Sequence, residues 1–480
     1  MVAFGTSGLR GLATDLLSGP GYVHVSAFAA HLAEAGRAAR GCAVFVGSDR
    51  RDSSPELTRQ TLAALAAAGF APVYCGVLPT PALAFHAMSL QAPAVMVTGS
   101  HIPADRNGLK FYRPDGEIDK ADERAIAALA AAAPAAVPAR LAALPAPDAA
   151  ARDRYAARYR AAFPSPILRA RRVGLWRHSS VAADLLAGLL AGLGAEVVEL
   201  GASDGFVAVD TEAIDAATAE RLAHWSRRHR LDAIVSTDGD GDRPLLADET
   251  GRIVRGDALG LVAARLLEAD AVVTPVSSNP GIDDRFGFAV IRTRVGSPFV
   301  LEGMDTAASR GFTRVLGFEA NGGLLLGSAV DLGAARLDAL PTRDSVLPLL
   351  CAFAAAGAHG LPLSKLFDDL ALPACVSGRV ENFSRADSDR LMAALRASPD
   401  AVDGILGPIG TATRIDDIDG LRIHLDGGGM IHLRPSGNAP EMRCYAAAPT
   451  PERAAALLAA GLAAIERFPD TNETLCGAGQ

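Results

Sequence analysis

Apolar and polar positions along this chain form a unit that recurs three times. Each copy begins with a short apolar run, passes through a polar loop into a longer segment with apolar residues at helical spacing, and ends in a second apolar run. The short runs predict strands and the longer segments predict helices. The predicted strands are residues 43–46 and 71–75, 172–176 and 195–200, and, in a weaker copy, 271–275 and 288–294.

The order strand, helix, strand is that of a βαβ unit. In the first copy Ser54 and Pro55 are predicted to be the N-cap and the first residue of a helix that runs to Ala68, and the helix of the second copy covers 181–193. We therefore predict an α/β protein with three domains of similar topology, each built on a mostly parallel sheet.

The last part of the chain lacks this unit. Strands are predicted at 376–382, 420–425 and 430–433 and a helix at 451–467, which indicates an α+β domain. An Ala- and Pro-rich stretch at 127–151 is typical of a helix that continues into a linker. The domains predicted from these patterns are 1–148, 149–252, 253–368 and 369–480.

Composition narrows the class of protein. A length of 480 residues suits roughly three or four domains, and a net charge of −8 argues against a nucleic-acid partner. Six cysteines without a CxxC pair favour a reducing compartment. No signal peptide is recognisable and no apolar run is long enough to span a bilayer, so we expect a cytoplasmic protein with no membrane partner. Both a monomer and a dimer are compatible with the sequence.

The stretch 94–112 contains the first candidate catalytic residues. An apolar strand ends just before Ser100 and His101, and an Asn-Gly turn leads on to Lys110, one of only three lysines in the chain. A hydroxyl, an imidazole and an amine on one loop are the groups that a nucleophilic phosphate-handling site needs. A serine after a glycine at a strand end is also a common turn or helix-cap residue, so this loop alone does not decide the function.

Three carboxylates, Asp238, Asp240 and Asp242, follow another buried-strand pattern and are separated by glycines. Their mutual repulsion calls for a cation, and hard oxygen ligands suit Mg²⁺, Ca²⁺ or Mn²⁺. An EF-hand loop is excluded because Arg243 replaces the required glycine, Pro244 follows it, and the flanking segments are strands. The loop therefore indicates an open metal site, with an acidic hairpin tip as the alternative.

Two further loops carry polar residues among glycines. Arg10 lies in a glycine-rich segment near the N-terminus, where the backbone can approach an anion while the guanidinium supplies charge. Glu319 and Asn321 lie two residues apart on a loop after an apolar strand, an arrangement that suits recognition of vicinal hydroxyls. Turns of this composition are common, so each signal is weak by itself.

The loop around residues 434–443 is more specific. Arg434 and Arg443 flank a turn that contains Ser436, Gly437 and Asn438. Main-chain amides in such a turn can surround an anion, and arginine binds phosphate through two parallel hydrogen bonds. The alternative is a surface turn with exposed arginines. A phosphate-binding loop here, together with the serine and aspartate loops, suits an enzyme that moves a phosphoryl group on a molecule already carrying one.

The motifs FGTSGLRG, TGSHIPADRNGLKFY, DGDGDRP, GFEANGG and RPSGNAPEMR follow one another along the whole chain. In their content, order and spacing they resemble those of the α-D-phosphohexomutase family. The resemblance implies three domains of one mixed α/β topology and a C-terminal α+β domain similar to the TATA-binding-protein fold. It also implies an active site in a central cleft.

The resemblance further implies roles for residues at matching positions. Ser100 matches the serine that is phosphorylated, with His101 beside it, Lys110 matches the general acid/base, and Arg10 and Arg243 match arginines near the transferring phosphate. The implied ligands of Mg²⁺ are Asp238, Asp240, Asp242 and an oxygen at Ser100. The implied substrate-binding residues are Glu319, Asn321 and Ser297 for the sugar, and Arg434, Ser436, Gly437, Asn438 and Arg443 for the phosphate that does not react.

The family mechanism implies interconversion of hexose 6-phosphate and hexose 1-phosphate through phosphoserine and a hexose 1,6-bisphosphate, which also serves as activator. We expect mannose phosphate to be preferred, with glucose or glucosamine phosphate as alternatives. A metal-dependent phosphatase with a serine nucleophile and a non-catalytic sugar-phosphate sensor are kept as competing hypotheses. Three positions depart from the family pattern: Ile102 after the histidine, Gly323 in the sugar loop, and Ser297 in the third domain.

Overall fold

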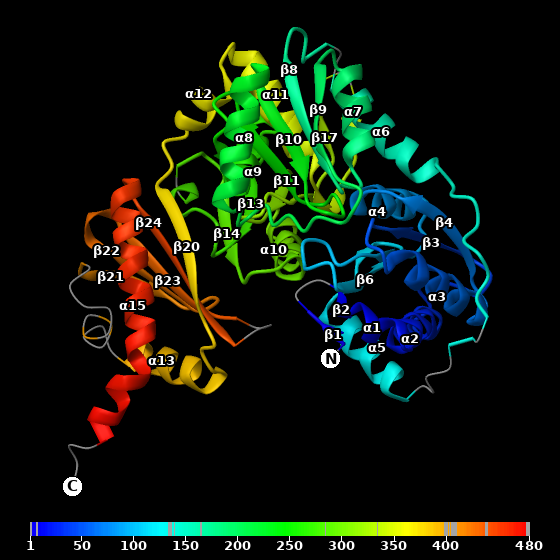
Figure 1. Ribbon diagram of the computed structural model, residues 1–480, viewed down its shortest axis with the longest axis horizontal. Helices are drawn as coiled ribbons and strands as arrows, with labels where there is room; N and C mark the ends of the chain where they lie inside the picture. Colours follow the sequence, from blue (N-terminus) through cyan, green and yellow to red (C-terminus); the bar gives the residue numbers. More distant parts are fainter. Residues whose placement is uncertain are drawn as a thin grey trace. The chain divides into compact units, whose positions relative to one another are not determined.

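The computed structural model describes residues 2–5, 8–132, 137–138, 140–163, 166–283, 285–333, 335–397, 402, 404, 410–436 and 440–476. Side chains are described as far as residue 468. The chain divides into two compact units, and each is described by itself. The first unit comprises Met1–Val273 and Gly296–Asp369, and the second comprises Thr274–Val295 and Leu370–Gln480. Figure 1 labels the elements of both units in chain order.

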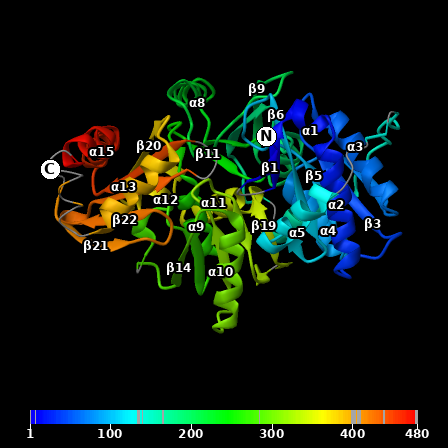
Figure 2. The ribbon, with the colours of Figure 1, turned by 90° about the horizontal axis from the view of Figure 1, so that it is seen from below.

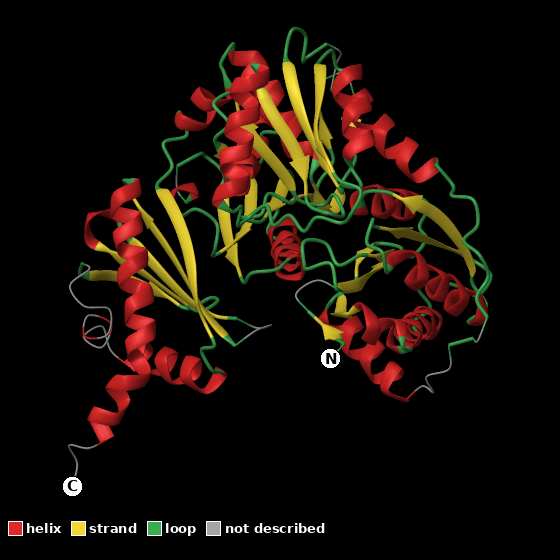
Figure 3. Ribbon diagram, viewed as in Figure 1, coloured by secondary structure: helices red, strands yellow, loops and turns green. Residues whose placement is uncertain are grey.

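The first sheet of the first unit is flanked by helices on both faces (Figure 3). Its strands in spatial order are β1 (Ala3–Phe4), β2 (Leu9–Leu12), β6 (Arg106–Arg113), β5 (Ala94–Val97), β3 (Ala43–Ser48) and β4 (Ala71–Val77), and β7 (Gly116–Glu117) pairs with β6. The helices are α1 (Ala13–Leu17), α2 (Pro20–Glu34), α3 (Ser54–Ala67), α4 (Thr80–Ser89) and α5 (Lys120–Ala132).

The alternation of side chains along β3 explains this layering. Val44 and Val46 pack in a buried core with residues of α2 and α3. Phe45 lies between them in the sequence, and its ring contacts the ring of His86 in α4, with centroids 4.6 Å apart. Because successive side chains of a strand point to opposite faces, an uninterrupted apolar run needs a helix on each side.

The start of α3 corrects one expectation. Its N-cap residue is Ser53 and not Ser54, and no side chain makes a capping hydrogen bond there. The hydroxyl of Ser54 instead donates to Asp49 Oδ1 at 2.5 Å. Asp49 is buried, and the need to satisfy its carboxylate draws Ser54 into the first turn of the helix.

Two more sheets complete the first unit. The second has the order β12 (Ile253–Val254), β11 (Pro244–Asp248), β10 (Ala233–Thr237), β8 (Arg172–His178) and β9 (Glu196–Ala202). The third runs from β13 (Ala271–Pro275) through β15 (Val315–Phe318) and β16 (Leu324–Leu326) to β19 (Leu340–Asp344). A separate hairpin pairs β17 (Val330–Asp331) with β18 (Arg336–Leu337). The helices are α6 (Ala150–Ala162), α7 (Ala183–Gly192), α8 (Ala216–His229), α9 (Gly256–Leu266), α10 (Ser297–Ser309), α11 (Val346–His359) and α12 (Leu363–Asp368).

The expectation of mostly parallel sheets is wrong. The first two predicted βαβ copies do form parallel pairs, β3 with β4 and β8 with β9. Each sheet then continues through antiparallel pairs, β5 with β6, β10 with β11 and β15 with β16. The three sheets are therefore mixed, and the antiparallel hairpins are the parts that carry the predicted site loops.

The second unit contains an antiparallel sheet with helices packed on it, as the predicted α+β class requires (Figure 2). The strand order is β20 (Ala374–Glu381), β24 (Glu441–Ala448), β23 (Met430–Pro435), β22 (Leu421–Leu425) and β21 (Ala412–Asp416). The other elements are η1 (Pro280–Ile282), β14 (Ala289–Thr293), α13 (Arg385–Ala397), η2 (Asp426–Gly428) and α15 (Pro451–Cys476). Of the helices described in either unit, none has the length and apolarity needed to cross a membrane.

Candidate active site

The aspartate loop is the tip of the hairpin between β10 and β11. The backbone of Gly239 approaches the serine loop so closely that a Cβ atom there would lie 2.9 Å from the carbonyl oxygen of Ser100 and 2.7 Å from the ring of Phe206. Only glycine fits this position without a shift of its neighbours. Gly239 therefore allows two loops that are distant in the sequence to touch.

The three carboxylates of this loop converge. Asp238, Asp240 and Asp242 are buried, and each offers an oxygen within 4.8 Å of the others. Within the described part of the chain, the Oδ1 atoms of Asp240 and Asp242 are buried and accept no hydrogen bond. Unsatisfied buried oxygens of this kind are the donors that a hard divalent cation takes, so these residues fit Mg²⁺.

Burial and neighbouring charges act on these carboxyl groups in opposite directions. Burial, reinforced by the carboxylates of Asp240 and Asp242, raises the pKa of Asp238 well above its usual range. Burial alone would also raise the pKa of Asp242, but the cations of Arg343 and Lys110 lower it below its usual range. The loop therefore holds its negative charge mainly where cationic side chains already contact it.

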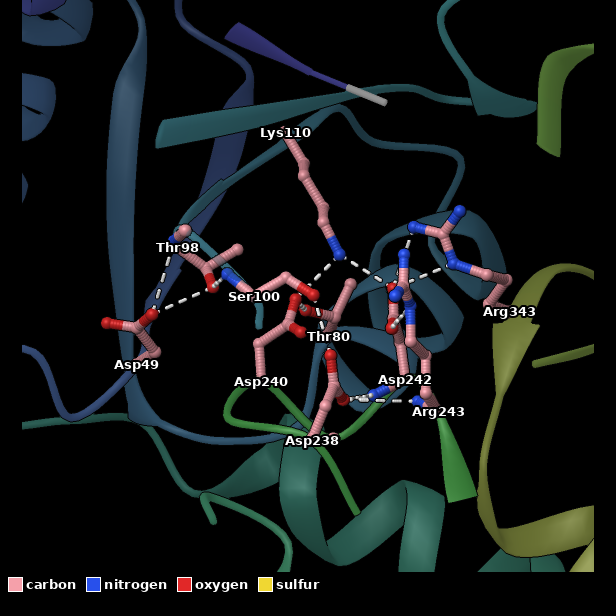
Figure 4. A network of polar contacts seen from close by, with 12 residues as sticks. Asp49, Thr80, Thr98, Ser100, Lys110, Asp238, Asp240, Asp242, Arg243 and Arg343 are labelled. Atoms are coloured by element: carbon pink, nitrogen blue, oxygen red, sulfur yellow. Dashed lines mark hydrogen bonds and ion pairs between the residues drawn. The ribbon is translucent and has the colours of Figure 1, made fainter. Parts of the chain in front are cut away.

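Lys110 extends from β6 into the carboxylate cluster (Figure 4). Its Nζ donates to Asp240 Oδ2 and to Asp242 Oδ2, both at 2.6 Å, and the side chain is almost completely buried. Thr80 at the start of α4 donates its hydroxyl to the same Asp240 oxygen at 2.6 Å. The sequence predicted Lys110 for the site but gave no indication of Thr80, which lies in an ordinary helix-start pattern.

Ser100 is held in an unusual backbone conformation beside Asp238. Its φ is 55°, in the left-handed region that few non-glycine residues adopt. Its N–H donates to Thr98 Oγ1 at 2.8 Å, and its hydroxyl donates to Asp238 Oδ2 at 2.6 Å. Nδ1 of His101 lies 3.3 Å from the same hydroxyl. The serine is thus presented at the carboxylate cluster by a turn that its surroundings must stabilise.

Arg51 supplies much of that support, and sequence reasoning missed it. Its guanidinium donates to the carbonyl oxygens of Ser100 at 2.9 Å and Ile102 at 2.6 Å, and its ion pair with Asp49 is fully buried. The guanidinium stacks on the ring of Phe206, with Cζ of Arg51 3.9 Å from the ring centroid. The hydrogen bond to Ile102 is made to its main-chain carbonyl, so it does not depend on which side chain stands at this position. The signal in the sequence was the pair Asp49 and Arg51 directly after a buried strand.

Three cationic or imidazole side chains surround this centre. Burial and the guanidiniums of Arg243 and Arg343 lower the pKa of Arg10 to about 10. Burial and the guanidiniums of Arg243 and Arg10 lower the pKa of His101, which favours the neutral imidazole. Nε of Arg243 is buried and donates no hydrogen bond to any described residue, although it lies 3.8 Å from Asp242 Oδ1. The Nε–H of Arg243 can therefore donate a hydrogen bond to an anionic ligand.

The predicted sugar loop follows β15 and lies against the same cluster. Glu319 is buried, and its Oε2 accepts from Arg343 at 3.3 Å. Asn321 uses its side-chain oxygen to accept the N–H of Gly323 at 3.0 Å, so this side chain closes its own loop. Ser297 at the start of α10 accepts from Arg343 at 2.8 Å. Arg343 joins Glu319 to Ser297, and no sequence motif indicated this arginine.

The predicted phosphate loop lies in the second unit, between β23 and β24. Arg434 and Arg443 are directly opposite each other in the strand register. Arg434 donates to Asp419 at 2.8 Å, Arg443 donates to Glu441 at 2.9 Å, and the N–H of Ser436 donates to the carbonyl of Glu441 at 3.0 Å. Gly437 and Asn438 lie outside the described residues. The sequence prediction of two arginines flanking a turn agrees with this hairpin.

Comparison with known proteins gives matches along the whole chain. The phosphoglucomutase/phosphomannomutase alpha/beta/alpha domains I, II and III match residues 1–136, 154–251 and 255–372, and the C-terminal domain of the same family matches residues 382–464. A phosphomannomutase of Sinorhizobium fredii (strain NBRC 101917 / NGR234) is 52% identical over 465 residues, which cover 96% of this chain and 98% of that protein.

A second relative and a solved structure agree with these matches. A phosphomannomutase of Salmonella muenchen is 43% identical over 455 residues, which cover 94% of this chain and 93% of that protein. The crystal structure of a phosphoglucomutase/phosphomannomutase family protein from Burkholderia thailandensis has a TM-score of 0.73 at 21% identity and covers 97% of both chains. At that identity the structural likeness indicates a shared fold.

Proposed function

The chain belongs to the phosphoglucomutase/phosphomannomutase family, and from that premise we propose that it interconverts hexose 6-phosphate and hexose 1-phosphate, with mannose phosphate preferred. The observation that carries this proposal is the contact between the hydroxyl of Ser100 and Asp238, 2.6 Å apart, at a buried cluster of three carboxylates. A nucleophile placed at a site for a hard cation is the arrangement that phosphoryl transfer needs.

Ser100 carries the phosphoryl group between turnovers in this proposal. In the first half-reaction the bond from Ser100 Oγ to phosphorus breaks and a bond from phosphorus to a sugar hydroxyl oxygen forms. Lys110, as the neutral amine, takes the proton of that hydroxyl and passes it to the departing Ser100 oxygen. The product is a hexose 1,6-bisphosphate. After it turns over, its other phosphoryl group passes to Ser100 Oγ. Lys110 takes the proton of the Ser100 hydroxyl and gives it to the sugar oxygen that is left. A hexose bisphosphate from solution also phosphorylates Ser100 and so acts as activator.

Asp238, Asp240 and Asp242 would hold Mg²⁺ together with an oxygen of the group on Ser100. Bound there, the ion would neutralise charge on the phosphoryl oxygens. Arg10 and Arg243 supply further positive charge to the phosphoryl group, and the unsatisfied Nε of Arg243 supports this role. His101 lies within reach of the serine hydroxyl and orients it.

The remaining predicted residues bind the parts of the substrate that do not react. Glu319, with Asn321 and Ser297 beside it, recognises sugar hydroxyls, because a carboxylate accepts two hydrogen bonds from neighbouring hydroxyl groups. The loop of the second unit holds the other phosphate through Arg434, Ser436, Gly437, Asn438 and Arg443. A separate phosphate site is needed because the sugar presents each of its two ends to Ser100 in turn.

Steady-state kinetics test the reaction type and the sugar. Mannose 1-phosphate, glucose 1-phosphate and glucosamine 1-phosphate are compared by kcat/KM in the presence of Mg²⁺ and the matching hexose bisphosphate. We expect kcat/KM to be highest for mannose 1-phosphate and lower for glucose 1-phosphate and glucosamine 1-phosphate. A clear preference for glucose or glucosamine phosphate would reject the choice of sugar and keep the mutase.

Inorganic phosphate measured in the same reactions tests the competing functions. A mutase returns every phosphoryl group to a sugar or to Ser100, so free phosphate should accumulate far more slowly than the isomer forms. Phosphate released at the turnover rate would identify a phosphatase. Sugar-phosphate binding without any turnover would identify a sensor.

A further inference from the structure

Arg343, near the end of β19, contacts several residues of the predicted site, although no sequence motif indicated it. Its side chain is 3% exposed. Nε and Nη2 donate to Asp242 Oδ2 at 3.0 and 2.8 Å, while Nη1 donates to Ser297 Oγ at 2.8 Å and to Glu319 Oε2 at 3.3 Å. A single guanidinium therefore joins the aspartate loop to the sugar loop, as its place next to Asp242 in Figure 4 illustrates.

Gly323 makes room for this arginine. A Cβ atom added at Gly323 would lie 2.7 Å from Cδ, 2.8 Å from Cγ and 3.0 Å from Cβ of Arg343. Distances under 3.0 Å between such atoms force one of them to move, so any larger residue at this position would displace the arginine stem. Two of the three departures from the family pattern, Gly323 and Ser297, lie directly against Arg343.

The carboxylate oxygens that Arg343 contacts show how it can hold two acidic side chains in place. Asp242 presents Oδ2 to Arg343 and Lys110, and its Oδ1 is left as a buried oxygen that accepts no hydrogen bond from the described residues. Glu319 likewise has one oxygen held by the arginine. Because the guanidinium is planar and rigid, fixing two of its edges also fixes the two carboxylates relative to each other.

We propose that Arg343 is a positioning residue that holds Glu319 in the orientation needed to bind the sugar hydroxyls, with Asp242 as its anchor. This inference rests on the proposed function, because it takes a hexose phosphate as the ligand of Glu319. The arginine acts through Glu319, and its hydrogen bonds run to Asp242, Ser297 and Glu319. Its loss therefore weakens sugar binding, and it does so even when no phosphoryl transfer takes place.

The test compares Arg343→Met, Arg343→Lys and Gly323→Ala with the wild type. Arg343→Met keeps much of the side-chain volume but removes the charge, and Arg343→Lys keeps the charge but removes the planar guanidinium. Gly323→Ala keeps Arg343 but displaces the aliphatic part of its side chain. Arg252→Met is the matched control, since Arg252 also makes an ion pair with a buried aspartate, Asp248, but lies half-exposed outside the site. Each variant is measured for KM, kcat, thermal stability and the Kd of mannose 1-phosphate on dephosphorylated protein.

We expect Arg343→Met to raise both the KM and the Kd about 10-fold or more, a larger factor than any fall in kcat, and Arg343→Lys to recover only part of this loss. Gly323→Ala should raise the Kd in the same direction while every charge is kept. The control should match the wild type in KM and Kd, whatever its thermal stability. Because the Kd is measured without turnover, a wild type that binds the sugar phosphate but does not isomerise it would reject the proposed function alone.

Two results would overturn the inference. The first is a Kd and a KM equal to those of the wild type in folded Arg343→Lys and Gly323→Ala proteins. The second is a fall in kcat that follows the loss of folded protein at unchanged KM, which is what a purely structural arginine produces. If Arg343→Met does not fold, Gly323→Ala decides, because it removes no charge and no hydrogen-bonding group.

Discussion

Two buried histidines, His178 and His432, make the fold sensitive to acid. Burial lowers the pKa of each to about 4, against a backbone hydrogen bond that acts in the opposite direction. In the unfolded chain the pKa is about 6.5, so the stability that each neutral ring contributes is complete above that value and is lost as pH falls from 6.5 towards 4. The loss reaches about 3 kcal/mol for each histidine.

Urea unfolding at pH 7.5 and pH 5 measures this effect. We expect His178→Asn to lose less stability between the two pH values than the wild type, since asparagine takes up no proton and tolerates the positive φ at this position. His359→Gln is the control, because His359 is exposed at the end of α11. An unchanged pH dependence in His178→Asn would show that the buried ring is not the acid-sensitive group.

Arg51 is the residue on which the serine loop depends most. Arg51→Met leaves the buried carboxylate of Asp49 without its cation and the carbonyls of Ser100 and Ile102 without their donor. We expect a loss of about 3–5 kcal/mol in unfolding free energy, with a further fall in specific activity of the protein that remains folded. Denaturant unfolding and active-site titration measure the two effects. Wild-type specific activity in the folded variant would contradict the role assigned to Arg51.

At the scale of elements, the hairpin between β10 and β11 presents three aspartates that we propose as the ligands of one divalent cation. We expect a chelator to abolish isomerisation and Mg²⁺ to restore it, because the three carboxylates provide oxygen ligands only. Asp240→Asn should weaken Mn²⁺ binding roughly 10-fold or more, since it removes one charged ligand. Asp184→Asn, on the exposed side of α7, is the control. Full activity in metal-free Asp240→Asn would contradict the assignment.

Most of these elements could be predicted from the sequence because their patterns are local. The apolar runs of β3, β8 and β10 are readable one segment at a time. Pairing direction is not local, and the antiparallel returns through β6, β11 and β16 were missed for that reason. The exact cap of α3 was missed because a buried carboxylate, Asp49, competes for the hydroxyl of Ser54.

At the scale of the whole molecule, the site residues that lie in compact sequence motifs could be predicted, and those outside such motifs could not. Ser100, Lys110 and the aspartates stand in compact motifs, and the first unit brings them together. Arg343 stands in an ordinary strand pattern, and its contacts come from residues about 24 to 100 positions away. Such a residue is found only when the fold is known. The division into domains 1–148, 149–252, 253–368 and 369–480 stays a prediction, as do the cytoplasmic location and the choice between monomer and dimer.

The second unit provides a prediction that concerns the complete enzyme. If Arg434 holds the phosphate that does not react, Arg434→Gln should raise the KM for mannose 1-phosphate about 10- to 100-fold, the loss of a charge-assisted hydrogen bond of about 1.5–3 kcal/mol. Phosphorylation of Ser100 by hexose bisphosphate should still occur at saturating concentration. Arg390→Gln, which changes an exposed ion pair on α13, is the control. An unchanged KM in Arg434→Gln would remove this loop from the substrate site.

The central claim is that Ser100 carries the phosphoryl group, and peptide mapping of the purified protein by mass spectrometry tests it most directly. We predict one phosphate on the peptide that contains Ser100, lost on incubation with excess mannose 1-phosphate and regained on addition of mannose 1,6-bisphosphate. Ser100→Ala should show neither the phosphate nor isomerisation. Isomerisation at the wild-type rate by Ser100→Ala, or a wild-type protein that turns over without ever carrying phosphate on Ser100, would contradict the account.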